Sequence, residues 1–195
     1  MPEPSRLGPL LVVISGPSGV GKTSVCAELA RRPGFERVVT ATTRQPRGRE
    51  RDGTDYHFTS RERFLADRDA GRFLEWAEVH GNLYGTPHAA ARLVLDGGRH
   101  ALLNIDVQGA ASIRASGFPA LLVFLLPPSA EVLAKRLRGR GTDPAGEIAR
   151  RIRDAEAEMA RQDEFDLKVV SDEIVATADR IEAALAAPAP DRPKC

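Results

Sequence analysis

Short runs of apolar residues recur along the chain and have the length of buried β-strands. The run at residues 10–14, Leu-Leu-Val-Val-Ile, is rich in branched side chains, and Ser15 ends it. An uninterrupted apolar run of this length is typical of a strand that is covered on both faces. Residues 73–79 instead alternate between apolar and polar, as in a half-buried strand. The strands predicted in this way cover residues 10–14, 35–41, 73–79, 101–106, 119–126 and 166–171.

Between the strands, apolar residues recur at the spacing of amphipathic helices. Val25 and Leu29 share one face of the first helix, and Ser60 and Ser129 stand where helix N-caps are expected. Residues 82–86 are expected to turn into the helix that begins near residue 87. The predicted helices cover residues 22–30, 60–70, 87–96, 107–115, 129–137, 144–162 and 174–187.

Composition narrows the class of protein. The 195 residues suit one domain with insertions, which would bury about 70% of the surface of its unfolded chain. The 28 basic and 27 acidic residues nearly cancel, so no overall field attracts nucleic acid or an anionic membrane, and any phosphate binding must be local. No apolar run approaches the roughly 18 residues of a membrane span and residues 1–8 lack a signal-peptide core, so we expect a cytoplasmic protein. Cys26 and Cys195 form no disulfide framework or metal cluster, and residues 188–195 should be disordered.

The segment at residues 16–23 fits the phosphate-loop pattern G-x-x-x-x-G-K-[ST], and it joins a predicted strand to a predicted helix. Glycines there let backbone N–H groups converge on phosphate, and the helix N-terminus adds its positive dipole end. Lys22 would reach the β- and γ-phosphates of ATP, and the Thr23 hydroxyl would hold Mg²⁺. The alternative is a glycine-rich turn that only joins a strand to a helix. The predicted ATP-binding residues are Gly16, Pro17, Ser18, Gly19, Val20, Gly21, Lys22 and Thr23.

A long polar stretch, residues 42–58, follows the first helix. Loops of this length inside a compact domain are usually functional or disordered. Arg44 and Arg47 flank a proline, and hydroxyls such as Thr40 and Tyr56 surround them, which suits a second phosphate. A solvated surface loop is the alternative.

Two further features suit a phosphate-transferring enzyme. Asp106 ends a predicted buried strand, where an acid in a phosphate-loop protein is expected to hold Mg²⁺ directly or through water; the alternative is that it caps the next helix. Arg136 and Arg140 lie four residues apart beside glycines, as in a mobile lid over a triphosphate. The alternative there is an exposed basic helix end.

Taken together, the motifs resemble those of the guanylate kinase family over about residues 10–184. Each motif alone is weak evidence, but all of them occur in the order that the family has. They are G-P-S-G-V-G-K-T at 16–23, T-T-R-Q-P-R at 42–47, G-T-D-Y-H-F at 53–58, F-L-E-W at 73–76, Y-G-T at 84–86, I-D-V-Q-G at 105–109 and R-L-R-G-R-G at 136–141.

The resemblance implies an α/β protein with the P-loop NTPase fold of the nucleoside monophosphate kinases. A parallel-sheet core (1–37, 88–128 and 152–187) would carry a GMP-binding insertion (38–87) and a lid (129–151). The implied activity is reversible, Mg²⁺-dependent transfer of the ATP γ-phosphoryl group to GMP, with dGMP as a further expected acceptor. The protein would be a monomer or a homodimer.

The resemblance also implies roles for single residues. Arg44, Arg47, Thr40, Tyr56 and Tyr84 would hold the GMP phosphate. The guanine side would be formed by Glu75, Thr86 and Asp106, and the catalytic residues would be Lys22, Arg44, Arg136, Arg140 and Arg151.

The chain departs from the family pattern at three positions that bear on the site. Thr40 stands where Ser is common, Asn104 where an acid is frequent, and Ser171 where Asn is common near the adenine. The hydroxyl at residue 40 is kept, whereas residue 104 cannot carry a charge.

Two other functions use the same scaffold. A guanylate-kinase-like module that binds phosphopeptides typically has a degraded phosphate loop, whereas Lys22 and Thr23 are intact here. A ribose 1,5-bisphosphate kinase would not need Glu75 and Thr86 to recognise a base.

Overall fold

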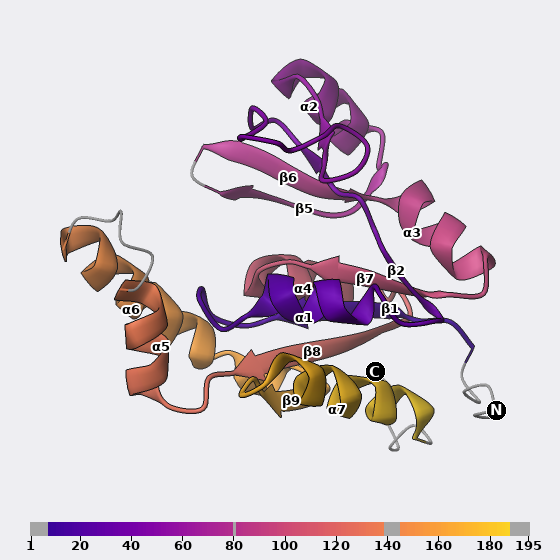
Figure 1. The fold of residues 1–195 in the computed structure, drawn as a ribbon. Helices are drawn as coiled ribbons and strands as arrows, with labels where there is room; N and C mark the ends of the chain where they lie inside the picture. The colour runs from indigo at the N-terminus through magenta and orange to yellow at the C-terminus, as the bar shows by residue number, and fades with distance from the viewer. Residues whose placement is uncertain (1–7, 80, 139–144, 188–195) are drawn as a thin grey trace.

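The computed structural model describes residues 8–79, 81–138 and 145–187, and it contains two sheets that lie one above the other (Figure 1). The larger sheet has five strands in the order β2-β7-β1-β8-β9. Every pairing within it is parallel, and Val13 of the central strand lies between Leu103 and Leu122. The strands are β1 (Leu11–Ser15), β2 (Phe35–Arg37), β7 (His100–Asn104), β8 (Ala120–Leu126) and β9 (Leu167–Val170).

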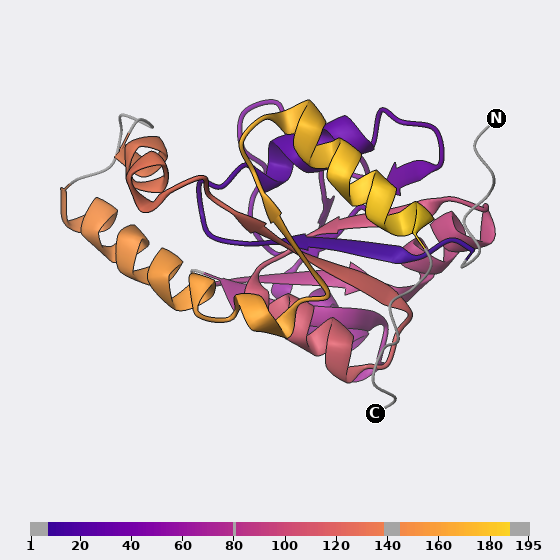
Figure 2. The ribbon, with the colours of Figure 1, turned by 90° about the horizontal axis from the view of Figure 1, so that it is seen from below.

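Helices cover both faces of this sheet (Figure 2). Successive side chains of a strand point to opposite faces. Val12 and Ile14 pack into one buried cluster with α1 (Lys22–Leu29) and α7 (Ile174–Ala186), and Leu11 and Val13 pack into another with α3 (His88–Asp96) and α4 (Val107–Ala115). This double covering explains why β1 is apolar at almost every position.

The smaller sheet has four strands in the order β4-β3-β6-β5. Gly85 of this sheet is required by packing, because a Cβ there would lie 2.9 Å from Phe64 Cζ and 3.0 Å from Phe73 Cδ1. Phe64 comes from α2 (Arg61–Asp69), which lies on the side of the sheet away from the core (Figure 1). The strands are β3 (Ala41–Thr42), β4 (His57–Phe58), β5 (Phe73–Val79) and β6 (Asn82–Pro87).

A third group of helices projects from the end of the core where the parallel strands terminate (Figure 1). It consists of α5 (Ala130–Arg138) and α6 (Ala145–Met159), followed by the short helix η1 (Gln162–Glu164). Leu133 and Leu137 of α5 pack on Ala155 of α6. Arg140 and the tail 188–195 lie outside the described residues.

The predicted elements agree with the structure except around the smaller sheet. The strand at 73–79 and the helix at 107–115 were predicted with the observed bounds. The single strand predicted at 35–41 is wrong, because the chain leaves the core after β2 and enters the other sheet as β3. Residues 82–86 lead into the predicted helix, which begins at His88, but no strand was predicted there: they belong to β6, whose backbone hydrogen bonds are with β5 and β3. The stretch 42–58, predicted as a loop, begins with the last residue of β3 and ends with β4.

None of the helices in the described part of the chain combines the length and the apolar character that crossing a membrane requires.

Candidate active site

The loop between β1 and α1 contains backbone positions that favour glycine. Gly16 has a φ of 135°, and a Cβ there would lie 2.5 Å from the carbonyl oxygen of Leu125 in the neighbouring strand β8. Gly21, with a φ of 112°, occupies the N-cap position of α1 in the left-handed region. These conformations turn the chain at the end of β1 and again at the start of α1, where backbone N–H groups and the helix dipole favour an anion.

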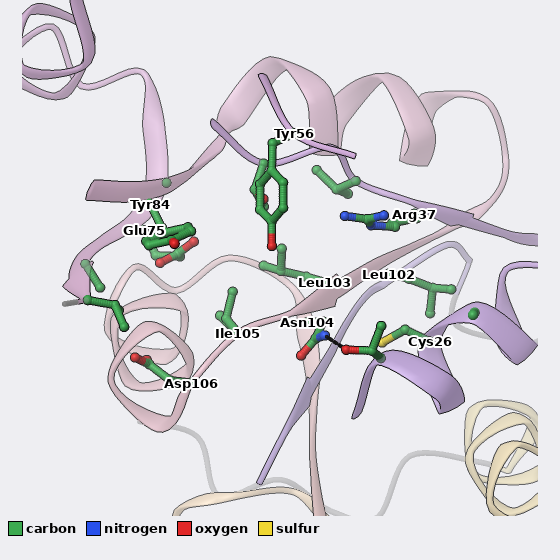
Figure 3. A pocket seen from close by; sticks show the side chains of 17 residues that line it. Cys26, Arg37, Tyr56, Glu75, Tyr84, Leu102, Leu103, Asn104, Ile105 and Asp106 are labelled. Atoms are coloured by element: carbon green, nitrogen blue, oxygen red, sulfur yellow. Dashed lines mark hydrogen bonds between the residues drawn. The ribbon is translucent and has the colours of Figure 1, made fainter. Parts of the chain in front are cut away.

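The two polar side chains that open α1 are oriented by hydrogen bonds. Lys22 Nζ donates to Gly16 O at 2.5 Å and to Pro17 O at 3.2 Å, so its ammonium group lies over the loop. Thr23 Oγ1 accepts a hydrogen bond from Asn104 Nδ2 at 3.3 Å (Figure 3). Asn104 is the last residue of β7, so this bond links the phosphate loop to the neighbouring core strand.

Side chains from α5 and α6 reach the same loop. Arg136 Nη1 donates to Val20 O at 3.0 Å and to Ser171 O at 3.4 Å. Glu158 Oε2 accepts a hydrogen bond from the Ser18 N–H at 3.2 Å, and burial raises the pKa of this carboxyl. Sequence reasoning missed Glu158, because it lies within a long charged helix where nothing distinguishes it from its acidic neighbours. Arg151 is half-buried on α6.

A cavity of about 330 Å³ lies between the two sheets, and α1 closes one side of it (Figure 3). A volume of this order accommodates a small ligand. Figure 3 shows Glu75 and Tyr84 at one end, Arg37 and Cys26 at the other, and the Tyr56 hydroxyl pointing into the space between them. The residues predicted from sequence that line it are Thr23, Thr40, Tyr56, Glu75, Tyr84 and Asp106.

The Glu75 carboxylate is the most unusual group in the cavity. Its residue is only 5% exposed, and its Oε1 accepts a hydrogen bond from Thr86 Oγ1 at 2.5 Å. Burial raises the pKa of Glu75 to about 7, although the Thr86 hydrogen bond opposes the shift, and the nearby Asp106 charge adds to it. The ion pairs found among residues 8–79, 81–138 and 145–187 include none to Glu75. The cavity thus holds a buried acid that still needs hydrogen-bond donors when ionised.

Asp106 has the capping role that was one of its two predicted interpretations. Its Oδ1 accepts hydrogen bonds from the N–H groups of Gln108 at 2.9 Å and Gly109 at 2.8 Å, which fixes the first turn of α4. That turn packs against Glu75, since a Cβ on Gly109 would lie 2.9 Å from Glu75 Oε2. The role of Asp106 in binding magnesium stays a prediction.

The two predicted phosphate-binding arginines differ in their surroundings. Arg44 is 8% exposed and lies behind Tyr56, with its guanidinium carbon 5.4 Å from the centre of that ring. Hydrogen bonds to Glu50 and Tyr84 raise the pKa of Arg44 further above its ordinary value. Arg47 is exposed and does not line the cavity. Arg44 therefore lies behind Tyr56, which lines the cavity, whereas Arg47 lies at the surface of the loop.

The donor set fits magnesium only as a partner of a bound nucleotide. Within the described residues, no group of three or more His, Cys, Asp or Glu side chains could hold a metal ion. Mg²⁺ commonly keeps several waters and binds one or two protein oxygens together with substrate phosphates. The Thr23 hydroxyl at the loop and the Asp106 carboxylate, at the N-cap of α4 two residues beyond β7, are oxygens of that kind.

A parallel sheet with this glycine-rich loop, and a cavity under a second sheet, define a P-loop kinase of the nucleoside monophosphate class. The model of the family "Guanylate kinase" matches residues 9–188. This chain therefore belongs to the guanylate kinase family, and it is a phosphotransferase.

Individual relatives agree with this placement. Guanylate kinase from Nitratidesulfovibrio vulgaris is 48% identical over 176 residues, which covers 90% of this chain and 85% of that protein. Guanylate kinase from Parasynechococcus marenigrum is 50% identical over 165 residues, covering 84% and 91%. The crystal structure of guanylate kinase from Anaplasma phagocytophilum has a TM-score of 0.74 and 32% identity, covering 93% of this chain and 86% of that one.

Proposed function

We propose that this protein transfers the γ-phosphoryl group of Mg-ATP to GMP, giving ADP and GDP, and that it accepts dGMP. The observation that carries the proposal is the buried Glu75 carboxylate in the cavity, 5% exposed and held on one oxygen by Thr86. In this proposal the core (1–37, 88–128 and 152–187) binds ATP, residues 38–87 bind GMP, and residues 129–151 form a lid.

Glu75 would select the base. Guanine presents N1–H and its 2-amino group as two parallel donors, which one carboxylate can accept side by side. Adenine presents a bare N1 acceptor instead, so an ionised Glu75 would face another acceptor while still buried. Sites built on such hydrogen bonds reject the wrong ligand by roughly 10⁴. Thr86 would hold the carboxylate in place, and Asp106 would complete the guanine side.

The acceptor phosphate would lie near the hydroxyls of Thr40, Tyr56 and Tyr84, with Arg44 and Arg47 providing the positive charge. Because the nucleophile is an anionic phosphate oxygen, the reaction needs no general base. The obstacle is the repulsion between two polyanions. Cations placed between them lower that repulsion and stabilise the charge that spreads over the transferred group.

On the donor side, the loop N–H groups and Lys22 would hold the β- and γ-phosphates, and Arg136, Arg140 and Arg151 would close over them. Thr23 and Asp106 would hold Mg²⁺, which neutralises phosphate charge when bound. Lys22 now contacts two loop carbonyls, so it would exchange these for phosphate oxygens when ATP binds.

The test is a turnover assay with Mg-ATP and one acceptor at a time, following ADP release. We expect turnover with GMP and dGMP and none with AMP, CMP, UMP or ribose 1,5-bisphosphate. Glu75→Gln should lose the preference for GMP over AMP, because an amide offers one acceptor and one donor. Turnover with ribose 1,5-bisphosphate alone would replace the proposal with a sugar-phosphate kinase. No turnover with any acceptor, from folded protein, would favour a phosphopeptide-binding module.

A further inference from the structure

Glu50, a residue that sequence reasoning did not single out, connects the two arginines proposed for the acceptor phosphate. Its Oε1 accepts a hydrogen bond from Arg44 Nη2 at 2.9 Å, and its Oε2 accepts one from the Arg47 N–H at 2.7 Å. Its own N–H donates to Arg47 O at 3.0 Å, which closes the turn between the two residues. One carboxylate thus fixes a side chain and a stretch of backbone together.

The Arg44 guanidinium is held on several sides. Nη1 donates to Gln45 O at 2.7 Å, Nη2 is held by Glu50, and the guanidinium carbon lies 5.4 Å from the centre of the Tyr56 ring. The Arg44 side chain is 9% exposed and that of Glu50 is 26% exposed. The hydrogen bonds from Arg44 and Arg47 hold the pKa of Glu50 below its usual range, so the carboxylate is ionised at neutral pH.

We propose that Glu50 is a positioning residue for the acceptor phosphate: it orients Arg44 and fixes the turn that carries Arg47, without touching the substrate. The inference rests on the proposed function, which assigns both arginines to the GMP phosphate. An arginine side chain has many rotamers, and ordering it on binding costs free energy. A guanidinium that is already oriented avoids this cost.

The same contact has a competing interpretation, in which Glu50 occupies Arg44 in place of a phosphate oxygen and is displaced by GMP. Two observations favour positioning. Glu50 uses its second oxygen to accept a hydrogen bond from the backbone of its own turn. The other terminal nitrogen of Arg44, Nη1, is held separately by Gln45 O. The two interpretations predict opposite changes in GMP affinity when the carboxylate is removed.

The experiment measures binding of GMP and of guanosine by calorimetry, without ATP, to the wild type, Glu50→Ala and Glu50→Gln. Guanosine lacks the phosphate and therefore reports on the rest of the site. We expect Glu50→Ala to bind GMP about 10- to 100-fold more weakly, with guanosine affinity unchanged. Glu50→Gln should fall between it and the wild type, because the two hydrogen bonds use different carboxylate oxygens and the amide keeps only one of those oxygens. In steady-state assays the KM for GMP should rise and that for ATP should stay constant.

Glu78→Ala is the matched control. Glu78 lies on β5 of the same sheet between Ala77 and Val79, which line the cavity, but its own side chain points to the opposite face and is exposed in an ion pair with Arg61 at 3.4 Å. This variant should bind GMP as the wild type does. Thermal melts of each variant without ligand show whether it is folded. If Glu50→Ala is unfolded, the comparison is made between Glu50→Gln and the wild type.

Three results would overturn the inference: unchanged GMP affinity in Glu50→Ala, tighter GMP binding, or equal losses for GMP and guanosine. The last would mean that the loop had loosened as a whole. If the wild type binds AMP and GMP with equal affinity, the proposed function is refuted instead. Failure of the Glu50 inference and failure of the proposed function are therefore distinguishable.

Discussion

Replacing Glu75 with Gln should stabilise the unliganded protein in alkaline solution while it removes guanine binding. The carboxyl has a pKa of about 7 in the folded protein against an ordinary value of 4.5, chiefly because of burial. As the pH rises from about 4.5, the unfolded chain loses this proton before the folded protein does. The contribution of Glu75 to the free energy of unfolding therefore falls between about pH 4.5 and pH 7 and becomes constant above that range.

The magnitude follows from the size of the shift. A change from 4.5 to about 7 corresponds to about 3 kcal/mol, at about 1.4 kcal/mol for each pH unit. Glutamine is neutral at every pH, so the variant avoids this cost. For a chain of this size, 1 kcal/mol moves the melting temperature by roughly 2–4 °C. We expect Glu75→Gln to melt about 6–12 °C above the wild type at pH 8.

The assay is a set of thermal melts of both proteins between pH 5 and pH 8, without nucleotide. The difference in melting temperature should grow with pH and level off above about pH 7. Glu78→Gln, an exposed acid on the same strand, should show no such trend. Added GMP should stabilise the wild type and leave Glu75→Gln unchanged. A difference between wild type and variant that does not depend on pH would refute the reasoning.

The same ionisation should control activity. At pH 6 about a tenth of the Glu75 side chains would be charged in the free enzyme, against half at pH 7, so kcat/KM for GMP should fall about fivefold between them. Excess GMP should shift the kcat profile to lower pH, because guanine donors favour the charged form. A kcat/KM that is flat down to pH 5 would contradict the assignment of Glu75 to the base.

Three further predictions concern other parts of the fold. Gly16→Ala should lower the free energy of unfolding by about 2 kcal/mol or more and abolish ATP binding, because the new Cβ would lie 2.5 Å from Leu125 O. A variant that binds ATP and resists urea as well as the wild type does would contradict this. His100 Nδ1 accepts a hydrogen bond from the Leu10 N–H, and burial lowers the pKa of His100. The unfolded chain therefore takes up this proton first, so the contribution of His100 to the free energy of unfolding should fall as the pH drops below about 6.5. His100→Gln should flatten that part of the pH profile in denaturant titrations, and parallel profiles would rule the effect out. Arg136→Lys keeps the charge but loses the planar guanidinium that donates to both Val20 O and Ser171 O, so kcat with GMP should fall at least tenfold in steady-state assays. An unchanged kcat would count against a catalytic role for Arg136.

The core of the molecule could be predicted from the sequence because its signals are local. The apolar run of β1 is covered on both faces, and the glycines at 16 and 21 adopt backbone conformations that other residues rarely reach. Strand, loop and helix are contiguous in the chain, so their pattern directly indicates a phosphate loop. The five-stranded order with β1 at its centre depends on non-local pairing, and no local pattern in the sequence specifies it.

The smaller sheet was harder to predict for the same reason. β3 and β4 are two residues long, and each depends on a partner that lies far away in the chain. β6 contains Asn82 and Gly85, which local propensity assigns to turns, yet its pairing with β5 makes it a strand. Gly85 is present because Phe64 and Phe73 fill the space where a side chain would lie. The sequence shows the glycine, but not the rings that require it.

Two glutamates of the acceptor half show what separates a residue type from a role. Glu50 is paired with Arg44 and its pKa is lowered, so its charge is satisfied within the protein and helps to hold the loop. Glu75 is buried beside the Asp106 charge and is held by hydrogen bonds from Thr86, and its pKa is raised. A buried ionised carboxylate is costly unless donors reach it. Guanine would bring two such donors to Glu75. The carboxylate that destabilises the free protein is therefore the one expected to gain most from the correct base. Both residues are simply glutamates in the sequence, and only their partners across the fold distinguish a structural counterion from a recognition group.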